Sequence, residues 1–440
     1  MFTKILIANR GEIAIRIIRA CKEMGISTVA VYSEADKESL HVALADQAIC
    51  IGGARAEDSY LNGQRILSAA LYTGAQAIHP GYGFLAENAG FADLCRKYGV
   101  KFIGPSGEVI SKMGDKDAAR RLMKANHVPT TPGTDILKDA AEAQAAAEKI
   151  GYPVLIKASA GGGGKGIRLV ERPEDMERAF ETASAEAEKA FGDGRMYMEK
   201  YLDPVKHIEV QLLADEAGHI VCLGERECSI QKNNQKLIEE SPSPAVDPET
   251  RKKLMDTATR AARAAGYVNA GTVEFLMDKD RNFYFMEMNT RLQVEHPVSE
   301  LVTGVDIVKW QIRIAAGVPL DFTQEDIHVQ GAAIECRINA KGPGKVDFFH
   351  TPGGPWVRFD TFLYQGYEIP PYYDSMLGKM IVYSSTREEA IRKMTAALSE
   401  LVIGGTLNNI EDQIDIIRDE RFKKGDYYTD FMKHFQRPGQ

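Results

Sequence analysis

The sequence predicts an α/β protein that begins with a doubly wound, largely parallel sheet and ends in a smaller α+β unit. Short apolar runs alternate with helical periodicity over roughly the first hundred residues, which is typical of βαβ units. Two prolines, Pro129 and Pro132, then interrupt the chain, and the composition changes again near Pro319. A length of 440 residues suggests about two to four structural units.

The composition is that of a globular enzyme. Hydrophobic residues make up 44% and charged residues 26% of the chain. A formal net charge of −8 argues against non-specific binding to nucleic acid. The 6 cysteines show no zinc or redox spacing, which fits reduced thiols and a cytoplasmic location. We see no signal peptide and no apolar run long enough to span a membrane, so no membrane association is expected.

The first unit opens with a βαβ pattern. Lys4 to Ala8 is a short apolar run, and apolar residues recur at helical spacing from Ala14 to Cys21. Thr28 to Tyr32 predicts the second strand. Only Gly11 lies in the first turn, so the glycine fingerprint of NAD-binding folds is missing and NAD binding is not favoured.

A glycine-rich loop follows the strand that ends near His79. Residues 79–83 read His-Pro-Gly-Tyr-Gly. In open α/β sheets, ligands bind at the carboxyl ends of strands, so Tyr82 and Gly83 are candidates for a binding site. The alternative is a tight turn in which Tyr82 packs locally.

A second glycine-rich loop lies in the middle unit. A helix is expected from Asp115 to Lys124, and strands from Val154 to Lys157 and from Ile167 to Val170. The segment between these strands, residues 159–166, contains four consecutive glycines. Backbone N–H groups of such a loop can surround phosphate, although the P-loop ending and its helix are absent. A purely structural hairpin tip is the alternative reading.

Further elements follow by the same criteria. We expect helices over residues 140–149, 173–190 and 248–265, and strands over 196–201, 207–213 and 220–223. The stretch from Arg226 to Lys236 is dense in hydrogen-bond donors. Lys236 is therefore either a solvated surface lysine or a side chain that faces an anion.

A pair of carboxylates marks the next hairpin. Glu274 lies in a predicted strand over residues 271–277, and Glu287 in another over 283–289. Alternation places Phe283, Phe285, Glu287 and Asn289 on one face, and a symmetric turn places Glu274 opposite Glu287. Like charges in that position are destabilising, and an all-oxygen cluster suits Mg²⁺ or Mn²⁺ bound with a nucleotide. The alternative is a solvated hairpin whose carboxylates pair with lysines.

The last unit follows a helix predicted from Glu300 to Ala316. A strand over residues 332–338 carries Arg337, a glycine- and proline-rich loop covers 341–355, and helices are expected over 387–401 and 409–418. Arg337 either acts on a ligand or pairs with Glu335 or Asp374.

Several long motifs, in order, make the chain resemble biotin carboxylase of the ATP-grasp superfamily. They are Asn9 to Ala14, His79 to Gly83, the glycine loop with Lys157, Glu287 to His296, Glu335 to Ala340 and Tyr373 to Ser375. The resemblance implies an N-terminal biotin carboxylase domain over residues 1–113, an ATP-grasp domain over 114–330 and a C-terminal domain over 331–440. A mobile lid is expected over about 132–203, because ATP must enter and water must then be excluded.

The resemblance implies residues for ATP and its metal ion. Lys116, Lys157 and the loop residues Gly161, Gly162, Gly163, Gly164 and Gly166 would hold phosphates. Glu199, Lys200, Tyr201, Leu202, His207, Gln231 and Asn234 would surround the nucleoside. Glu274, Glu287 and Asn289 would bind Mg²⁺ or Mn²⁺.

The resemblance also implies residues for bicarbonate and biotin. Arg291, Lys236, Gln293 and Val294 would bind bicarbonate, with Glu295 as its general base. Arg337 would stabilise the biotin enolate oxygen, and Tyr82 and Gly83 would border the biotin site. The chain departs from the family at Lys232-Asn233-Asn234 and at Lys341-Gly342-Pro343.

The implied reaction is ATP-dependent carboxylation of biotin on a separate carrier protein, by way of carboxyphosphate. The chain has no Ala-Met-Lys-Met motif, so biotin carboxyl carrier protein and carboxyltransferase subunits are the expected partners. Acetyl-CoA carboxylase is the expected parent complex, and a two-subunit pyruvate or propionyl-CoA carboxylase is the alternative. A homodimer is expected, with Arg16, Arg19 and Glu23 of the first helix as its contact. The other hypotheses are an ATP-grasp carboxylate–amine ligase and a non-catalytic nucleotide-binding subunit.

Overall fold

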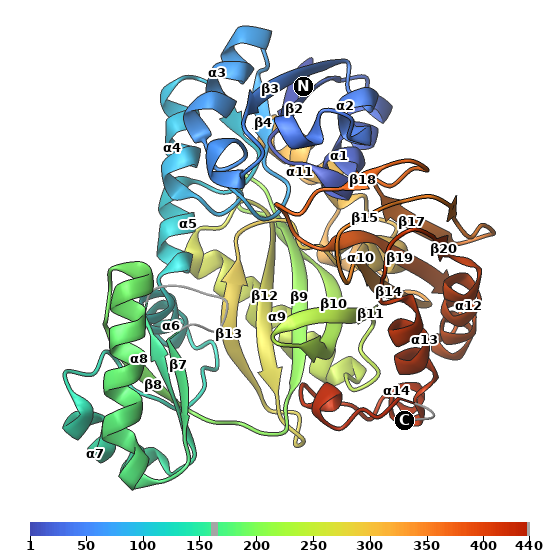
Figure 1. The fold of residues 1–440 in the computed structure, drawn as a ribbon. Helices are drawn as coiled ribbons and strands as arrows, with labels where there is room; N and C mark the ends of the chain where they lie inside the picture. The colour runs from blue at the N-terminus through green and yellow to red at the C-terminus, as the bar shows by residue number, and fades with distance from the viewer. Residues whose placement is uncertain (160–165, 438–440) are drawn as a thin grey trace.

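The computed structural model describes residues 1–159 and 166–437. Figure 1 shows an N-terminal layer, a central sheet, a unit that projects from that sheet, and a C-terminal layer beside it. Because the first, middle and last thirds of the chain meet over the central sheet, side chains far apart in sequence can share one site.

The N-terminal layer is a five-stranded parallel sheet in the order β3-β2-β1-β4-β5. Its strands are β1 (Lys4–Ile7), β2 (Ser27–Ser33), β3 (Gln47–Gly52), β4 (Ala77–His79) and β5 (Lys101–Phe102). Its helices are α1 (Gly11–Glu23), α2 (Leu40–Leu44), α3 (Gly63–Thr73), α4 (Ala89–Lys97) and α5 (Gly107–Gly114). Ile5 and Ile7 of β1 pack with α1, whereas Leu6 packs with α3 and α4 on the other face. The doubly wound arrangement is therefore confirmed.

The centre is an eight-stranded antiparallel sheet in the order β13-β12-β9-β10-β11-β14-β19-β17. The first five strands in chain order are β9 (Lys206–Ala214), β10 (Ile220–Lys232), β11 (Gln235–Ser241), β12 (Asn269–Met277) and β13 (Phe283–Asn289). Helices α6 (Lys116–Ala125) and α9 (Pro248–Ala265) pack with α5 on one face of these strands. That apolar packing leaves the opposite face for polar side chains.

The projecting unit contains a three-stranded antiparallel sheet in the order β7-β6-β8 (Figure 1). Its elements are α7 (Ala140–Ile150), β6 (Val154–Ala158), β7 (Ile167–Val170), α8 (Met176–Phe191) and β8 (Met196–Lys200). It has a small apolar core of its own, built mainly of alanine, methionine and branched residues. A separate core lets this unit keep its shape apart from the central sheet.

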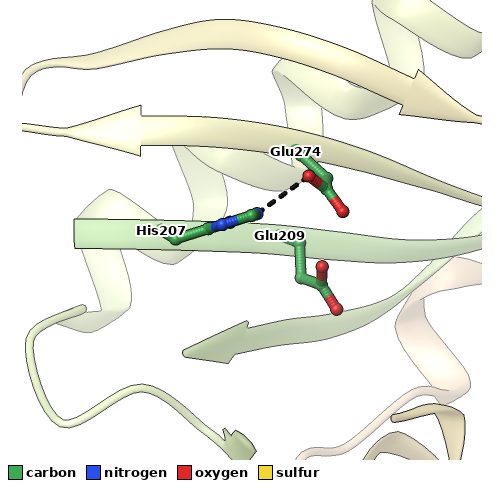
Figure 2. A group of neighbouring side chains, drawn as sticks. All are labelled: His207, Glu209 and Glu274. Atoms are coloured by element: carbon green, nitrogen blue, oxygen red, sulfur yellow. Dashed lines mark ion pairs between the residues drawn. The ribbon is translucent and has the colours of Figure 1, made fainter. Parts of the chain in front are cut away.

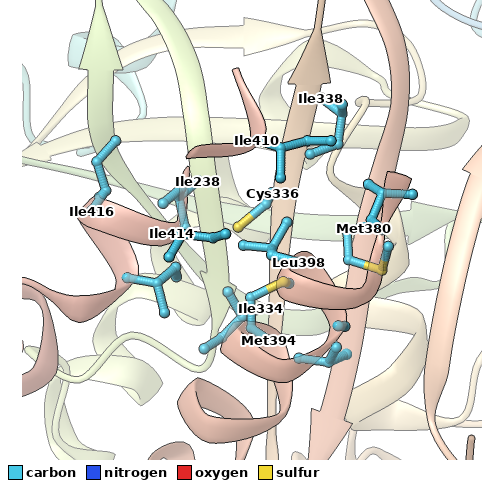
Figure 3. Close-up of a cluster of buried hydrophobic side chains, with 14 of the residues drawn as sticks. Ile238, Ile334, Cys336, Ile338, Met380, Met394, Leu398, Ile410, Ile414 and Ile416 are labelled. Atoms are coloured by element: carbon cyan, nitrogen blue, oxygen red, sulfur yellow. The ribbon is translucent and has the colours of Figure 1, made fainter. Parts of the chain in front are cut away.

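The C-terminal layer completes the central sheet and covers it with helices. The strands that belong to that sheet are β14 (Ala332–Asn339), β17 (Val357–Thr361) and β19 (Met376–Ser384). Two small sheets pair β15 (Gly344–Lys345) with β18 (Glu368–Ile369) and β16 (Phe349–His350) with β20 (Val402–Ile403). The helices of this layer are α12 (Arg387–Glu400), α13 (Ile410–Arg418) and α14 (Glu420–Lys424). Figure 3 shows Ile334, Cys336 and Ile338 of β14 packed against side chains of α12 and α13. Since alternate residues of a strand face opposite sides, this packing directs Glu335 and Arg337 away from the core.

The structure corrects two local predictions in the middle of the chain. The helix expected from Glu300 to Ala316 is two helices, α10 (His296–Thr303) and α11 (Ile307–Ala315), because Gly304 ends the first with a φ of 73°. The predicted strand at 220–223 continues as β10 to Lys232, so the polar stretch is part of the central sheet.

The chain also forms short 3-10 helices. They are η1 (Glu34–Asp36), η2 (Ala56–Asp58), η3 (Pro173–Asp175), η4 (Gln324–Asp326) and η5 (Phe431–Lys433). Within residues 1–159 and 166–437, we find no helix with the length and apolar character needed to cross a bilayer.

Candidate functional site

A cavity of about 940 Å³ lies where the N-terminal layer, the central sheet, the projecting unit and the C-terminal layer meet. Most of the predicted site residues line it. They are Tyr82, Gly83, Lys116, Lys157, His207, Gln231, Asn234, Lys236, Glu274, Glu287, Asn289, Arg291, Gln293, Val294, Glu295 and Arg337. The fold therefore brings the nucleotide, bicarbonate and biotin candidates into one space.

Lys236 lies at the centre of this cavity. Its Nζ donates hydrogen bonds to Glu295 Oε1 at 2.6 Å, Glu209 Oε2 at 2.7 Å and Glu274 Oε1 at 3.0 Å. Burial would lower the pKa of Lys236, but these three carboxylates outweigh it and hold the pKa well above its usual value. Lys236 is thus a fixed cation and not a solvated surface lysine.

Glu295 is held between two cations. Its Oε1 accepts from Lys236, and its Oε2 accepts from Arg337 at 3.0 Å. Burial would raise the pKa of Glu295, but Lys236 and Arg337 together hold it below its usual value. A buried carboxylate that stays ionised is able to accept a proton from a bound ligand.

Arg337 donates from Nε to Glu239 Oε1 at 2.6 Å and from its terminal nitrogen to Glu295. Burial raises the pKa of the Glu239 carboxyl to about 7, although the positive charge of Arg337 opposes that rise. Among the described residues, neither carboxyl oxygen of Glu335 has a hydrogen-bond partner. Arg337 therefore does not form the pairing with Glu335 that was the alternative interpretation, and Glu239 is a neighbour that sequence reasoning missed.

Glu274 and Glu287 lie directly opposite each other on β12 and β13, as predicted. The predicted face is wrong in part, because a register shift next to this pair inserts Met286. Phe285 consequently packs in the apolar core, whereas Met286, Glu287 and Asn289 line the cavity. The bulge therefore turns the carboxylate toward the site.

The carboxylate pair fits a divalent cation. Burial and the neighbouring Glu274 raise the pKa of Glu287, and its nearest cation is Lys116 Nζ at 3.8 Å. Asn289 donates to Glu274 Oε1 at 2.9 Å, so all three predicted metal ligands are adjacent. A divalent cation would remove the repulsion between the carboxylates.

A second group of possible metal ligands lies beside it. Figure 2 shows His207 and Glu209 on β9 and Glu274 on the neighbouring β12. His207 Nε2 is 2.9 Å from Glu274 Oε2. Burial would lower the pKa of His207, but Glu274 raises it overall, which favours the protonated ring. Because Lys236 also contacts both carboxylates, this group is better described as an ion-pair network than as a metal site.

Arg291 is fixed by three polar side chains. It donates to Glu87 Oε2 and to Gln293 Oε1, both at 2.8 Å, and to Asn289 Oδ1 at 3.2 Å. Glu87 was missed by sequence reasoning because it lies about 200 residues away, in the loop that follows the glycine-rich segment near Tyr82. Such a fixed guanidinium suits a planar oxyanion.

Among the described nucleotide candidates on the projecting unit, Lys157 lines the cavity. Lys157 is paired with Glu199, whose other oxygen is 3.7 Å from Arg120 Nε. Lys200 donates to the carbonyl oxygens of Gly151 and Tyr152. The described residues that line the cavity do not include the other described candidates of this unit, which are Gly166, Glu199, Lys200, Tyr201 and Leu202. Gly161, Gly162, Gly163 and Gly164 lie outside the described residues.

The two departures from the family pattern come together in space. Asn233 and Asn234 form the turn between β10 and β11, with φ values of 53° and 61°. Lys232 and Lys341 line a second cavity of about 630 Å³. Gln235 and Asn339 line both cavities, so the second one lies directly behind a wall of the site.

Three family models match the chain in sequence. "Biotin carboxylase, N-terminal domain" matches residues 1–110. "Carbamoyl-phosphate synthase L chain, ATP binding domain" matches residues 115–323. "Biotin carboxylase C-terminal domain" matches residues 335–434.

Individual proteins match over nearly the whole chain. Biotin carboxylase 1 of Bacillus subtilis is 53% identical and covers 99% of this chain and 99% of its own. A pyruvate carboxylase subunit of Methanothermobacter thermautotrophicus is also 53% identical, over 99% of this chain and 91% of its own. The biotin carboxylase domain dimer of Hydrogenobacter thermophilus 2-oxoglutarate carboxylase, solved with MgADP, ADP and bicarbonate, has a TM-score of 0.95 at 51% identity, covering 98% of this chain and 97% of that one.

Proposed function

This chain belongs to the biotin carboxylase family of ATP-grasp carbon–nitrogen ligases, and from that premise we propose how its residues divide the reaction. The family carboxylates biotin, with ATP, a divalent metal ion and bicarbonate. We assign residues 1–113, 114–330 and 331–440 to three domains, with 132–203 as a lid over the nucleotide. The separate apolar core of the projecting unit supports the assignment of the lid.

Glu274, Glu287 and Asn289 would hold Mg²⁺ or Mn²⁺, which would neutralise phosphate charge. Lys116 and Lys157 contact phosphates. The residues that surround the nucleoside are His207, Gln231, Asn234 and the segment from Glu199 to Leu202. In support, Lys116 and Lys157 both line the cavity, each next to a carboxylate.

Bicarbonate is bound by Arg291, Lys236, Gln293 and Val294. Glu295 removes its proton, and the resulting carbonate dianion attacks the terminal phosphorus of ATP, which forms carboxyphosphate and releases ADP. The single observation that carries this proposal is the position of Glu295 between Lys236 and Arg337, which keeps the carboxylate ionised inside the protein. The same two cations attract a bicarbonate anion to the base.

Biotin is placed against Arg337, with Tyr82 and Gly83 at its border. Negative charge develops on the ureido oxygen as N1 loses its proton. A guanidinium that is already fixed by Glu239 can stabilise that charge without reorganising. Carboxyphosphate then breaks down to CO₂ and phosphate. That phosphate is the base for N1, because Glu295 serves bicarbonate, and the N1 anion takes up the CO₂.

The test is to measure ATP hydrolysis and transfer of labelled carbon from bicarbonate to free biotin. We expect hydrolysis to require bicarbonate and the label to appear on biotin. Hydrolysis that instead requires a carboxylic acid and an amine would support the carboxylate–amine ligase alternative. ATP binding without any turnover would support a regulatory subunit.

The parent complex is proposed to be an acetyl-CoA carboxylase in the cytoplasm, with a biotin carboxyl carrier protein and carboxyltransferase subunits. The similar proteins also include subunits of pyruvate and 2-oxoglutarate carboxylases, so those acceptors are alternatives. Purifying the biotinylated carrier that binds this chain, and assaying it with acetyl-CoA, pyruvate, propionyl-CoA and 2-oxoglutarate, distinguishes them.

We also propose a homodimer. Arg16 was expected at the contact, but it is buried and its guanidinium donates to Glu300 at 2.8 Å and Asp306 at 2.7 Å within the same chain. Arg19 is exposed on the same helix and remains a candidate. A molecular-mass measurement at micromolar concentration that finds only monomer would remove this proposal.

A further inference from the structure

Lys379 of β19 is completely buried, with 0% of its surface exposed, and does not line the site cavity. Its Nζ donates to the backbone carbonyl of Val294 and is 3.2 Å from Glu12 Oε1. Tyr82 donates its hydroxyl hydrogen to the same Glu12 oxygen. One buried ammonium therefore joins the C-terminal layer, the loop at Val294 and the N-terminal layer.

The contact at Val294 bears directly on the proposed base. The carbonyl of Val294 belongs to the same planar peptide unit as the backbone N–H of Glu295. Fixing that plane fixes the Cα of Glu295, whose side chain then reaches Lys236 and Arg337. Lys379 is also the cross-strand partner of Arg337 in the ladder between β14 and β19.

The contact at Glu12 bears on the other half of the site. Glu12 is buried at the start of α1, and its second carboxyl oxygen has no hydrogen-bond partner among the described residues. Within that part of the chain, Lys379 and Tyr82 are the side chains that hold its first oxygen. A buried charge in such a place is costly unless it is paired, so Glu12 and Lys379 stabilise each other and orient the Tyr82 ring together.

We propose that Lys379 and Glu12 are positioning residues that hold the bicarbonate loop and the Tyr82 border of the biotin site in one fixed geometry. This inference rests on the proposed roles of Val294, Glu295 and Tyr82. Lys379 does not line the cavity, whereas Glu12 lies in its wall. Lys379 acts through the Val294–Glu295 peptide, and Glu12 acts through Tyr82.

The test compares Lys379→Met with Lys206→Met. Lys206 is a matched control because it is also a buried ammonium, donating to backbone carbonyls of Gly425 and Tyr427, but it does not line the cavity. Lys379→Met should raise the KM for bicarbonate by about tenfold or more, because Val294 and Glu295, which contact the anion, would be misplaced, while the KM for ATP stays the same. Lys206→Met should change neither KM.

Glu12→Gln gives a second, milder readout. It keeps a hydrogen-bond acceptor for Tyr82 but removes the charge opposite Lys379, so both the bicarbonate and the biotin KM should rise. The inference would be overturned if Lys379→Met left the KM for bicarbonate unchanged and lowered the melting temperature only as much as Lys206→Met does. It would also be overturned if Glu12→Gln left the KM values for bicarbonate and biotin unchanged. If Lys379→Met fails to fold, the Glu12→Gln KM values decide alone. Failure of the proposed function would look different, because the unaltered protein would then show no bicarbonate-dependent hydrolysis.

Discussion

Replacing Arg337 with alanine should separate the two half-reactions. The guanidinium is held by Glu239 at 2.6 Å and Glu295 at 3.0 Å, so it is a preorganised donor for charge on the biotin oxygen. Losing one such donor costs about 3 kcal/mol, or about a hundredfold in the rate of biotin carboxylation. Glu295 would keep its 2.6 Å contact with Lys236, so bicarbonate-dependent ATP hydrolysis should fall by less than about tenfold.

The assay follows phosphate release and carboxybiotin formation in the same samples, together with a melting curve. Arg387→Ala is a matched control, because Arg387 also forms a buried pair with a glutamate, Glu240, but lies outside the cavity. It should lower the melting temperature without changing the ratio of the two activities. A parallel loss of both activities in Arg337→Ala, with a melting shift like that of Arg387→Ala, would show that Arg337 only supports the fold.

Three further predictions concern the carboxylates of the site. Glu287→Gln should raise the Mg²⁺ concentration needed for ATP hydrolysis, since it removes one ligand charge, and an unchanged Mg²⁺ titration would contradict the metal assignment. Glu87→Gln should raise the bicarbonate KM by weakening the hold on Arg291, whereas the ATP KM should not move. Glu209→Gln should destabilise the protein most above about pH 4.5. Burial would raise the pKa of Glu209, but the charges of Arg226 and Lys236 outweigh that effect and lower the pKa from 4.5 to about 2. That carboxylate contributes stability above its unfolded pKa and loses it as pH falls toward 2, so unfolding measurements should find the smallest difference from wild type at low pH.

Short-range patterns predicted the parts of the fold that depend on local sequence. The helix at 248–265 and the pairing of Glu274 with Glu287 followed from periodicity and turn length. The bulge at Met286 could not be predicted in that way, because a single extra residue leaves the apolar pattern almost unchanged.

The long-range pairs of the site were beyond sequence reasoning. Glu209 contacts Lys236, Glu239 contacts Arg337, and Glu87 contacts Arg291. In each pair the two residues come from strands or loops that are distant in the sequence. Glutamates of this kind look like surface residues in a sequence, since charged residues are mostly exposed. Only the folded arrangement shows that they hold the cations of the site.

The most direct test of the proposed mechanism is the rate of bicarbonate-dependent ATP hydrolysis by Glu295→Gln without biotin. The substitution keeps the size of the side chain but removes the group that accepts the bicarbonate proton. We predict a rate loss of about a hundredfold or more at saturating ATP and bicarbonate, because general base catalysis contributes on that order. Hydrolysis within about twofold of the wild-type rate would contradict the central claim that Glu295, held ionised by Lys236 and Arg337, is the base that activates bicarbonate.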